Sequence, residues 1–209
     1  MDYQLLSATE RDAIVARHLR DFLPSLGLTE RAIRSWIDGS HFPVRRLFEI
    51  QLLKGASMKA NWGFSLDFVP HISGGRVRWH RTDKTAMLDV VLDPKDLHTP
   101  SYIHGPARLE EGLQRLLPEA TARARESWRR GATFHGMLEL IRDIQDKHTN
   151  YFSYQNYIQL PLAYAFLLAK TGDSEAAKTE LDKYAHLHRL DEDEAAKLKK
   201  LAIDFAGPT

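Results

Sequence analysis

Residues that could bind a metal ion or transfer protons gather in one segment of the chain, between positions 67 and 80. Asp67, His71 and His80 lie there, together with Arg76 and Arg78. The Gly-Gly pair between them predicts a tight hairpin turn, and counting back from this turn sets His71 opposite Arg78. His71 and His80 then share one strand face with Asp67, and a His–His–Asp set of this kind can bind zinc.

Two arginines on the same face argue against a metal site. Arg76 and Arg78 would place positive charge beside the two histidines, and this charge repels a cation. We therefore expect no metal and no other cofactor, and we interpret the face as a solvated surface of mixed charge that a partner can reach. The candidate partner surface consists of Asp67, His71, Arg76, Arg78 and His80.

Residue types used in nucleophilic catalysis also occur in this segment, but their spacing is unsuitable. Ser65, Asp67 and His71 lie along one expected strand, so the first and the last are roughly 20 Å apart, too far for a proton relay. The chain has no cysteine, no G-x-S-x-G elbow and no phosphate-binding glycine loop. No catalytic motif is present, and an enzyme whose polar groups assemble from loops and helices stays as an alternative.

The expected hairpin is also rich in basic residues, which makes nucleic-acid binding a further alternative. Arginines interleaved with aromatic residues can contact phosphates and stack on bases. However, Trp79 alternates with Val77 on the expected apolar face, and the formal net charge of the chain is only +1, so no global field attracts nucleic acid. We therefore place this alternative behind a protein partner. The basic residues concerned are Arg76, Arg78, His80, Arg81 and Lys84.

The element that must position these side chains is a long strand, expected over Asn61–Ile72. Its even positions, beginning with Trp62, hold large apolar side chains, and its odd positions are mostly small, polar or charged. A period of two predicts one face buried in the core and the other face open to water. Similar alternation predicts strands at 48–52, 76–81 and 86–92. Together the four strands form an antiparallel meander.

Helical patterns flank this sheet. Ser7 and Glu10 form a capping box for a helix that ends near Leu23. Residues 29–38 fit either a short helix, which we favour slightly, or a first edge strand. From position 107 onward the pattern is almost wholly helical.

The chain divides by composition into a helix plus sheet over 1–94, a connector over 95–106 and a helical region over 107–209. We expect the helical region to pack on the apolar face of the sheet, so that the whole makes one compact α+β domain. One of its helices is expected to end before Pro118. Asp191 and Glu194 form a capping box for the last helix.

The composition is that of a globular protein in an aqueous compartment. Of 209 residues, 43% are hydrophobic and 27% are charged, a balance that supports a buried core without metal or disulfide. The first residues lack a basic stretch followed by an apolar run, and the most apolar segment is too short for a bilayer. We therefore expect a cytoplasmic protein with no membrane association, whose oligomeric state is left open.

Residues 160–185 resemble one tetratricopeptide-type helical hairpin. Small residues at the matching positions let two antiparallel helices approach closely. A tetratricopeptide solenoid needs about three repeats, so a single copy implies a helical hairpin and no peptide-binding groove. The matching residues are Ala163, Tyr164, Gly172, Asp173, Ala176 or Ala177, and Leu181.

Residues 22–72 resemble a bacterial family known as domain of unknown function 4304. In that family a helix ends in a Leu-Gly-Phe-like turn, and a strand with a glutamine, a tryptophan-containing turn and a second strand follow. The matching positions are Leu26-Gly27-Leu28, Gln51, Trp62-Gly63 and Phe64–Phe68. Leu28 stands where the family tends to have an aromatic residue, and the helical second half lies outside the pattern. The resemblance implies an α+β fold without an established activity, of a type suspected of neutralising toxins as immunity proteins.

The sequence therefore favours a non-enzymatic protein-binding module, of an immunity or accessory type if the resemblance holds. The basis is a well-formed core without a catalytic or cofactor motif, together with an expected exposed sheet face. An enzyme with a site assembled from several elements and a nucleic-acid binder remain the alternatives.

Overall fold

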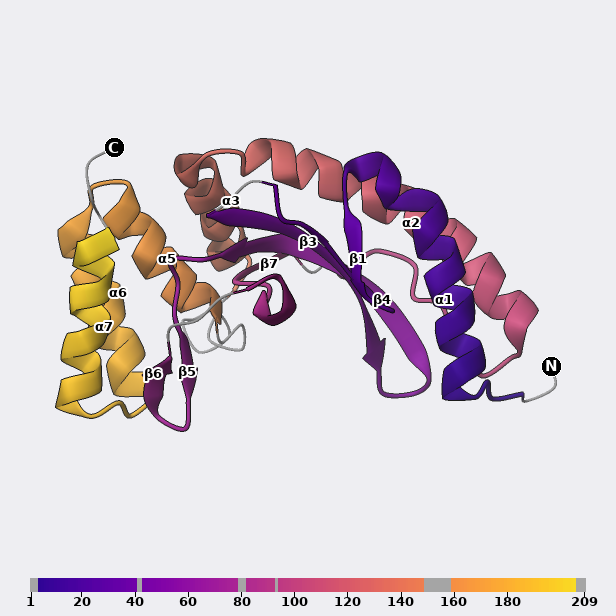
Figure 1. Ribbon diagram of the computed structural model, residues 1–209, viewed down its shortest axis with the longest axis horizontal. Coiled ribbons are helices and arrows are strands. Elements are labelled where there is room, and N and C mark those ends of the chain that lie inside the picture. Colours follow the sequence, from indigo (N-terminus) through magenta and orange to yellow (C-terminus); the bar gives the residue numbers. More distant parts are fainter. Residues whose placement is uncertain (1–3, 41–42, 79–81, 93, 149–158, 206–209) are drawn as a thin grey trace. The chain divides into compact units, whose positions relative to one another are not determined.

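The computed structural model describes residues 4–40, 43–78, 82–92, 94–148 and 159–205 (Figure 1). Its helices and its antiparallel sheet confirm the predicted α+β class. The chain forms two compact units, and the division falls inside the segment expected as one long strand and again after Trp128, rather than at 95–106. The first unit consists of Met1–His41, Arg45–Phe64 and Leu92–Trp128, and the second of Phe42–Val44, Ser65–Val91 and Arg129–Thr209.

The strands of the described residues form two sheets instead of one four-stranded meander. The larger sheet has five strands in the order β1-β2-β3-β4-β7, and β5 pairs with β6 in a separate hairpin. Of the expected strand at 76–81, residues 79–81 lie outside the described residues. The strands span Thr29–Ala32 (β1), Ser35–Asp38 (β2), Val44–Leu53 (β3), Ser57–Leu66 (β4), His71–Ser73 (β5), Arg76–Arg78 (β6) and Val90–Leu92 (β7).

Residues 29–38 form the β1–β2 hairpin, so the short helix favoured from the sequence is wrong. The alternative of a first edge strand is correct in part, because the segment folds as two strands and only β1 of the two lies at an edge of the sheet. Strand β2 pairs antiparallel with β3, which sets Trp36 opposite Phe48 and Ile37 opposite Leu47. All four side chains are buried. Strand propensity depends on cross-strand neighbours of this kind, and they outweigh the weak helical spacing within the segment.

The long strand expected over Asn61–Ile72 breaks after Leu66. Residues 67–69 form a turn in which the Val69 N–H donates to the Leu66 carbonyl at 3.0 Å. Pro70 follows, and a proline has no N–H to donate to a sheet. Strand β5 therefore starts anew at His71 and leaves the five-stranded sheet.

Strand β4 is buried on both faces, so the expected open face is wrong for this strand. Asn61 is 7% exposed and Ser65 is fully buried. Within the first unit, the Trp62 indole donates to the Ser127 hydroxyl at 3.1 Å, and the Trp128 indole donates to the Gly63 carbonyl at 3.0 Å. Alternation alone cannot reveal such coverage, because small polar residues suit a tightly covered face as well as a wet one.

The helices begin largely where the sequence predicts. The Ser7 hydroxyl accepts from the Glu10 backbone, and the Glu10 carboxylate accepts from the Ser7 backbone at 3.1 Å, which completes the predicted capping box. The α-helices of the described residues are α1 (Ala8–Phe22), α2 (Pro106–Arg130), α3 (Phe134–Asp146), α5 (Gln159–Lys170), α6 (Ser174–Leu187) and α7 (Glu192–Phe205).

Helix α2 continues through Pro118, where the sequence predicts an end. Proline removes one helical hydrogen bond, at a cost of about 3 kcal/mol. The buried stripe of α2 nevertheless continues beyond it through Ala120, Ala124 and Trp128. Burial of these side chains at roughly 25 cal/mol per Å² offsets the lost bond, so tertiary packing keeps the helix whole.

The segment expected as a connector is fixed to its own unit. The Met58 N–H donates to the Pro100 carbonyl at 2.9 Å, and the Tyr102 N–H donates to the Ala56 carbonyl at 3.0 Å. Gln4 pairs with the backbone near His104 from the other side. These backbone hydrogen bonds hold the segment against the start of β4 and against the residues that precede α1.

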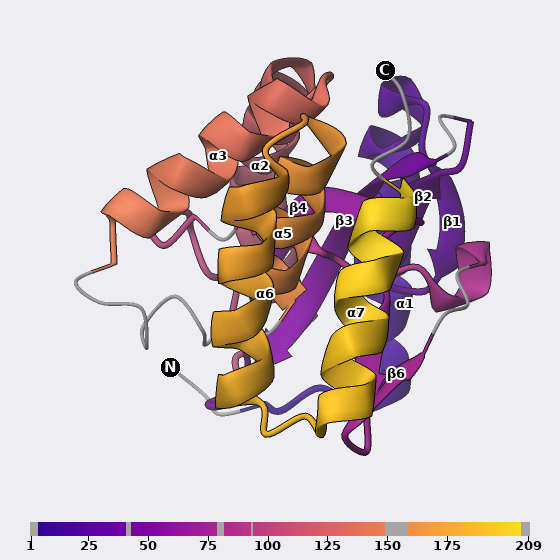
Figure 2. The ribbon, with the colours of Figure 1, turned by 90° about the vertical axis from the view of Figure 1, so that its left-hand side faces the viewer.

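In the second unit, α5 lies among α3, α6 and α7 (Figure 2). It is apolar nearly all round, as predicted for a central helix, and Leu160 to Ala169 are buried except Tyr164. Gly172 takes a φ of +89° in the turn to α6, a conformation that suits glycine. No described helix combines the length and the apolar character that crossing a bilayer requires.

Candidate partner-binding surface

Three of the five residues predicted to face a partner come together on the β5–β6 hairpin. His71 pairs with Arg78, and Ser73 pairs with Arg76 across the Gly74–Gly75 turn, so the predicted register is confirmed. His80 lies outside the described residues. Asp67 is only 8% exposed and lies in the turn after β4, where its N–H donates to the Pro43 carbonyl at 2.9 Å. Asp67 therefore does not belong to the exposed surface.

The hairpin has one apolar and one polar face. Because side chains alternate along a strand, Val77 points to the opposite side from Arg76 and Arg78. Val77 is 3% exposed, whereas both arginines are exposed. Within the described part of the chain neither arginine forms an ion pair. We call the face formed by His71, Ser73, Arg76 and Arg78 the basic hairpin.

Helix α7 holds the hairpin through the backbone of Val77. The Val77 N–H donates to a Glu194 carboxylate oxygen at 2.6 Å, and the Lys197 ammonium donates to the Val77 carbonyl at 3.2 Å. In a hairpin of this register the N–H and C=O of Val77 point away from β5, so these side chains cover a strand edge. Figure 2 shows β6 beside α7. The basic hairpin thus rests on a fixed support.

This contact of Glu194 was not predicted from the sequence, in which Glu194 is expected to cap the N-terminus of its own helix. The expected capping box is only half formed: the Asp191 carboxylate accepts from the Glu194 N–H at 2.8 Å, but the Glu194 side chain is turned to Val77. The only available signal was a Glu–x–x–Lys pair, and Lys197 lies 3.6 Å from Glu194. Such pairs are common on helix surfaces, so the pattern could not reveal its target.

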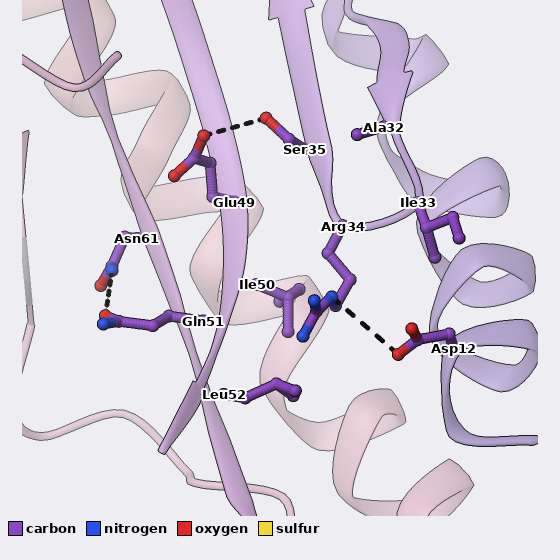
Figure 3. A pocket seen from close by; sticks show the side chains of 10 residues that line it. All are labelled: Asp12, Ala32, Ile33, Arg34, Ser35, Glu49, Ile50, Gln51, Leu52 and Asn61. Atoms are coloured by element: carbon purple, nitrogen blue, oxygen red, sulfur yellow. Dashed lines mark hydrogen bonds and ion pairs between the residues drawn. The ribbon is translucent and has the colours of Figure 1, made fainter. Parts of the chain in front are cut away.

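A second candidate site, in the first unit, was not anticipated. An open pocket of about 860 Å³ lies between α1, the β1–β2 turn, β3 and β4 (Figure 3). Its lining combines apolar with charged and amide side chains. The lining residues are Asp12, Ala32, Ile33, Arg34, Ser35, Glu49, Ile50, Gln51, Leu52 and Asn61.

The carboxylates of the pocket each use one oxygen within the protein. Glu49 Oε1 accepts from Ser35 Oγ and from Arg31, both at 2.9 Å. Asp12 Oδ1 accepts from Arg11 at 2.8 Å and lies 3.9 Å from Arg34. These contacts orient both carboxylates without occupying their second oxygens.

Two amides face each other across β3 and β4 at the far side of the pocket. The Asn61 amide donates to Gln51 Oε1 at 2.9 Å (Figure 3). Asn61 Oδ1 is buried, and no described residue donates to it. A buried acceptor without a donor costs about 1–3 kcal/mol. Asn61 Oδ1 is one of several buried polar atoms that the described residues leave without a hydrogen-bond partner.

The histidines with shifted pKa values lie away from both sites. Burial lowers the pKa of His18, His98 and His188, and the positive charge of a neighbouring arginine adds to the effect for the first two. None of the three lines the pocket or belongs to the basic hairpin. Over the described residues, no group of three or more His, Asp or Glu side chains could hold a metal ion.

No protein-family model matches the chain, and no curated protein and no solved structure matches it either. The resemblance to domain of unknown function 4304 therefore stays a prediction.

Proposed function

We propose that this protein is a non-enzymatic protein-binding module whose basic hairpin docks on an acidic surface of a partner protein. The observation that carries the proposal is the pair of exposed arginines, Arg76 and Arg78, without an ion-pair partner within the described residues. An immunity or accessory role would be one form of such binding.

Charge complementarity defines the partner. Arginine guanidinium groups form bidentate hydrogen bonds with carboxylates, and Arg76 and Arg78 project from the same strand face, about 7 Å apart by strand geometry. Two carboxylates spaced along a strand or a helix of the partner would match this separation. The support of β6 by Glu194 and Lys197 reduces the entropy lost on docking, because the hairpin is already ordered.

The proposal favours a protein over nucleic acid because the hairpin is small and the chain is nearly neutral. Nucleic-acid binding relies on several phosphate contacts and an extended positive field, whereas the formal net charge is +1.

The test is affinity capture from native lysate, followed by purification of any retained protein and measurement of its affinity. Wild-type protein is compared with the double variant Arg76→Glu, Arg78→Glu. We expect the variant to lose at least about tenfold in affinity, since charge reversal turns attraction into repulsion. Wild-type binding should also weaken with added salt.

The matched control is Arg125→Glu with Arg142→Glu, which makes the same change in net charge at two exposed helical arginines. This control should bind like the wild type. Equal losses in both double variants would reject the hairpin as the docking surface. Salt-dependent binding of RNA or DNA that only the hairpin variant loses would replace the protein partner with nucleic acid.

A further inference from the structure

We propose that the pocket of the first unit binds the C-terminal end of an extended polypeptide from a partner protein. The bound segment lies along the open edge of β3 and places its terminal carboxylate on the guanidinium of Arg34. This surface is distinct from the basic hairpin, and binding here does not depend on the proposed function.

Strand β3 extends beyond the point where its neighbour β2 begins. Ser35 lies opposite Glu49, and the Ile50 N–H donates to the Arg34 carbonyl at 2.9 Å. Backbone groups two residues apart on a strand point to the same side, so the N–H and C=O of Leu52 point to the side of β2, where β2 is no longer present. Within the described part of the chain, no residue bonds to Leu52 on this side, and Leu52 lines the pocket.

The opposite edge of the β3–β4 pair is covered by the chain itself. The Met58 N–H donates to the Pro100 carbonyl at 2.9 Å, and the Tyr102 N–H donates to the Ala56 carbonyl at 3.0 Å. Proteins generally cover the edges of their sheets, and an edge left open is a template on which a further strand can add. The open side of Leu52 therefore favours an extended polypeptide as the ligand.

The start of β2 determines which end of this polypeptide enters the pocket. A strand added in line with β2 meets the β1–β2 turn at Ile33 and Arg34 (Figure 3), so it must end there. If the strand is antiparallel to β3, as β2 is, its C-terminus meets Arg34. If it is parallel, its N-terminus does. A terminal carboxylate is attracted by the guanidinium and a terminal ammonium is repelled, which selects the antiparallel strand and its C-terminus.

The Arg34 guanidinium is available for a carboxylate. Its side chain is 34% exposed and lies 3.9 Å from Asp12, too far for a hydrogen bond. Asp12 is held more closely by Arg11, at 2.8 Å, and Glu49, on the other face of β3 from Leu52, pairs with Arg31 at 2.9 Å. Three arginines thus stand against two carboxylates, and Arg34 can bind a further carboxylate with two parallel hydrogen bonds.

The test uses two tetrapeptides of the sequence Thr-Val-Thr-Val, whose residue types favour an extended backbone. Both are acetylated at the N-terminus, and one ends in a free carboxylate, the other in an amide. Titrations of the full chain followed by NMR should show the acid peptide binding at least about tenfold more tightly than the amide peptide. The backbone amide signal of Leu52 should shift with the acid peptide. Acetate, which cannot pair with Leu52, should bind at least about tenfold more weakly than the acid peptide.

Substitutions then locate the carboxylate. Arg34→Gln should lower the affinity for the acid peptide at least about tenfold and leave that for the amide peptide unchanged. Arg34→Lys keeps the charge but loses the two-pronged contact, so its affinity should fall in between, and it serves as the second variant if Arg34→Gln does not fold. Arg125→Gln, at an exposed arginine of α2 in the same unit, is the matched control and should bind like the wild type.

Any of four results would overturn the proposal. Equal binding of the acid and amide peptides would exclude capture of the carboxylate. Acetate binding as tightly as the acid peptide, without a shift at Leu52, would leave only a site for small anions. The lack of any NMR shift with either peptide up to about 5 mM would exclude strand addition, since millimolar affinity is expected even of so small a ligand. A dimer of the chain that the acid peptide dissociates would assign the edge of β3 to a second copy instead of a partner.

Discussion

The basic hairpin and the β2–β3 pair of the five-stranded sheet contain the same kinds of charged residues but use them differently. In the β2–β3 pair, Asp38 of β2 is buried and accepts from both Arg46 and Ser40. On the hairpin, Arg76 and Arg78 are exposed and have no ion-pair partner within the described residues. The comparison separates charges that stabilise the fold from charges that are available for binding.

The difference arises from burial. A buried charge must be paired and hydrogen-bonded, or it destabilises the native state. An exposed charge is solvated and contributes little to stability. Substitutions of the charged residues of the β2–β3 pair are therefore expected to change folding stability, and substitutions of those on the basic hairpin are expected to change binding.

The largest effect is expected for Asp38→Ala. This change leaves the Arg46 guanidinium, 28% exposed, without its carboxylate and should lower the free energy of unfolding by about 2–3 kcal/mol. Urea denaturation measures it. Glu111→Ala, which breaks an exposed pair with Arg108, is the control and should cost no more than about 0.5 kcal/mol. Equal losses in the two variants would contradict the comparison.

The ionisation of Asp38 should also make the free energy of unfolding depend on pH. Burial raises the pKa of Asp38, but hydrogen bonds from Ser40 and then from Arg46 outweigh it, and the pKa lies below its ordinary value. A carboxyl whose pKa is lowered on folding stabilises the native state above its unfolded pKa, near 3.8, and this stabilisation is lost as pH falls through the folded pKa. As pH falls, the free energy of unfolding of Asp38→Ala should therefore decrease less than that of the wild type.

A smaller effect is expected where the hairpin meets α7. Glu194→Ala removes the acceptor of the Val77 N–H and should cost about 1–2 kcal/mol in the free energy of unfolding. Glu192→Ala removes an exposed carboxylate from the same helical turn and controls for the helix dipole. Hydrogen exchange at Val77 should accelerate in the first variant alone. Unchanged exchange in both would show that α7 does not hold the hairpin.

A still smaller effect, on the pH dependence of the free energy of unfolding, is expected from His188 at the end of α6. Its ring lies 4.1 Å from the Tyr184 ring, between centroids, and burial lowers its pKa. The neutral form is therefore favoured in the native state, and the stabilisation present above pH about 6.5 is lost as pH falls through that value toward the folded pKa. His188→Phe keeps a ring beside Tyr184 and should flatten the decline in stability between about pH 7 and pH 5. An unchanged slope would exclude His188 as its source.

The smallest effect is expected for Arg76→Ala with Arg78→Ala. Both side chains are exposed, so the free energy of unfolding should change by no more than about 0.5 kcal/mol. Thermal and urea denaturation measure this. A loss above about 1.5 kcal/mol would mean that the arginines stabilise the hairpin itself, and the contrast with Asp38 would disappear.

Local signals in the sequence predicted local structure well. The Gly74–Gly75 turn led to the correct pairing of His71 with Arg78. Ser7 and Glu10 marked the start of α1, and Asp173 marked that of α6. Each of these features depends on residues within a few positions of one another, so the backbone and its nearest side chains suffice to form them.

Features that depend on distant residues were missed. The period of two over Asn61–Ile72 did not reveal the break at residues 67–70 or the burial of Asn61 and Ser65. The Asn61–Gln51 pair needs two strands in register, and the contact of Glu194 with Val77 joins positions 117 residues apart. No spacing rule within one segment contains this information.

Hydrophobic period, capping residues and turn glycines act over short distances, so they were enough to predict the α+β class, the capping box of α1 and the register of the basic hairpin. Which charged side chains are exposed depends instead on tertiary packing. The sequence pattern predicted that Asp67 and Arg78 are both exposed. In the structure, Asp67 is 8% exposed in the turn after β4, whereas Arg78 is exposed on β6. Burial depends on what packs over a residue, and the covering residues come from elsewhere in the chain.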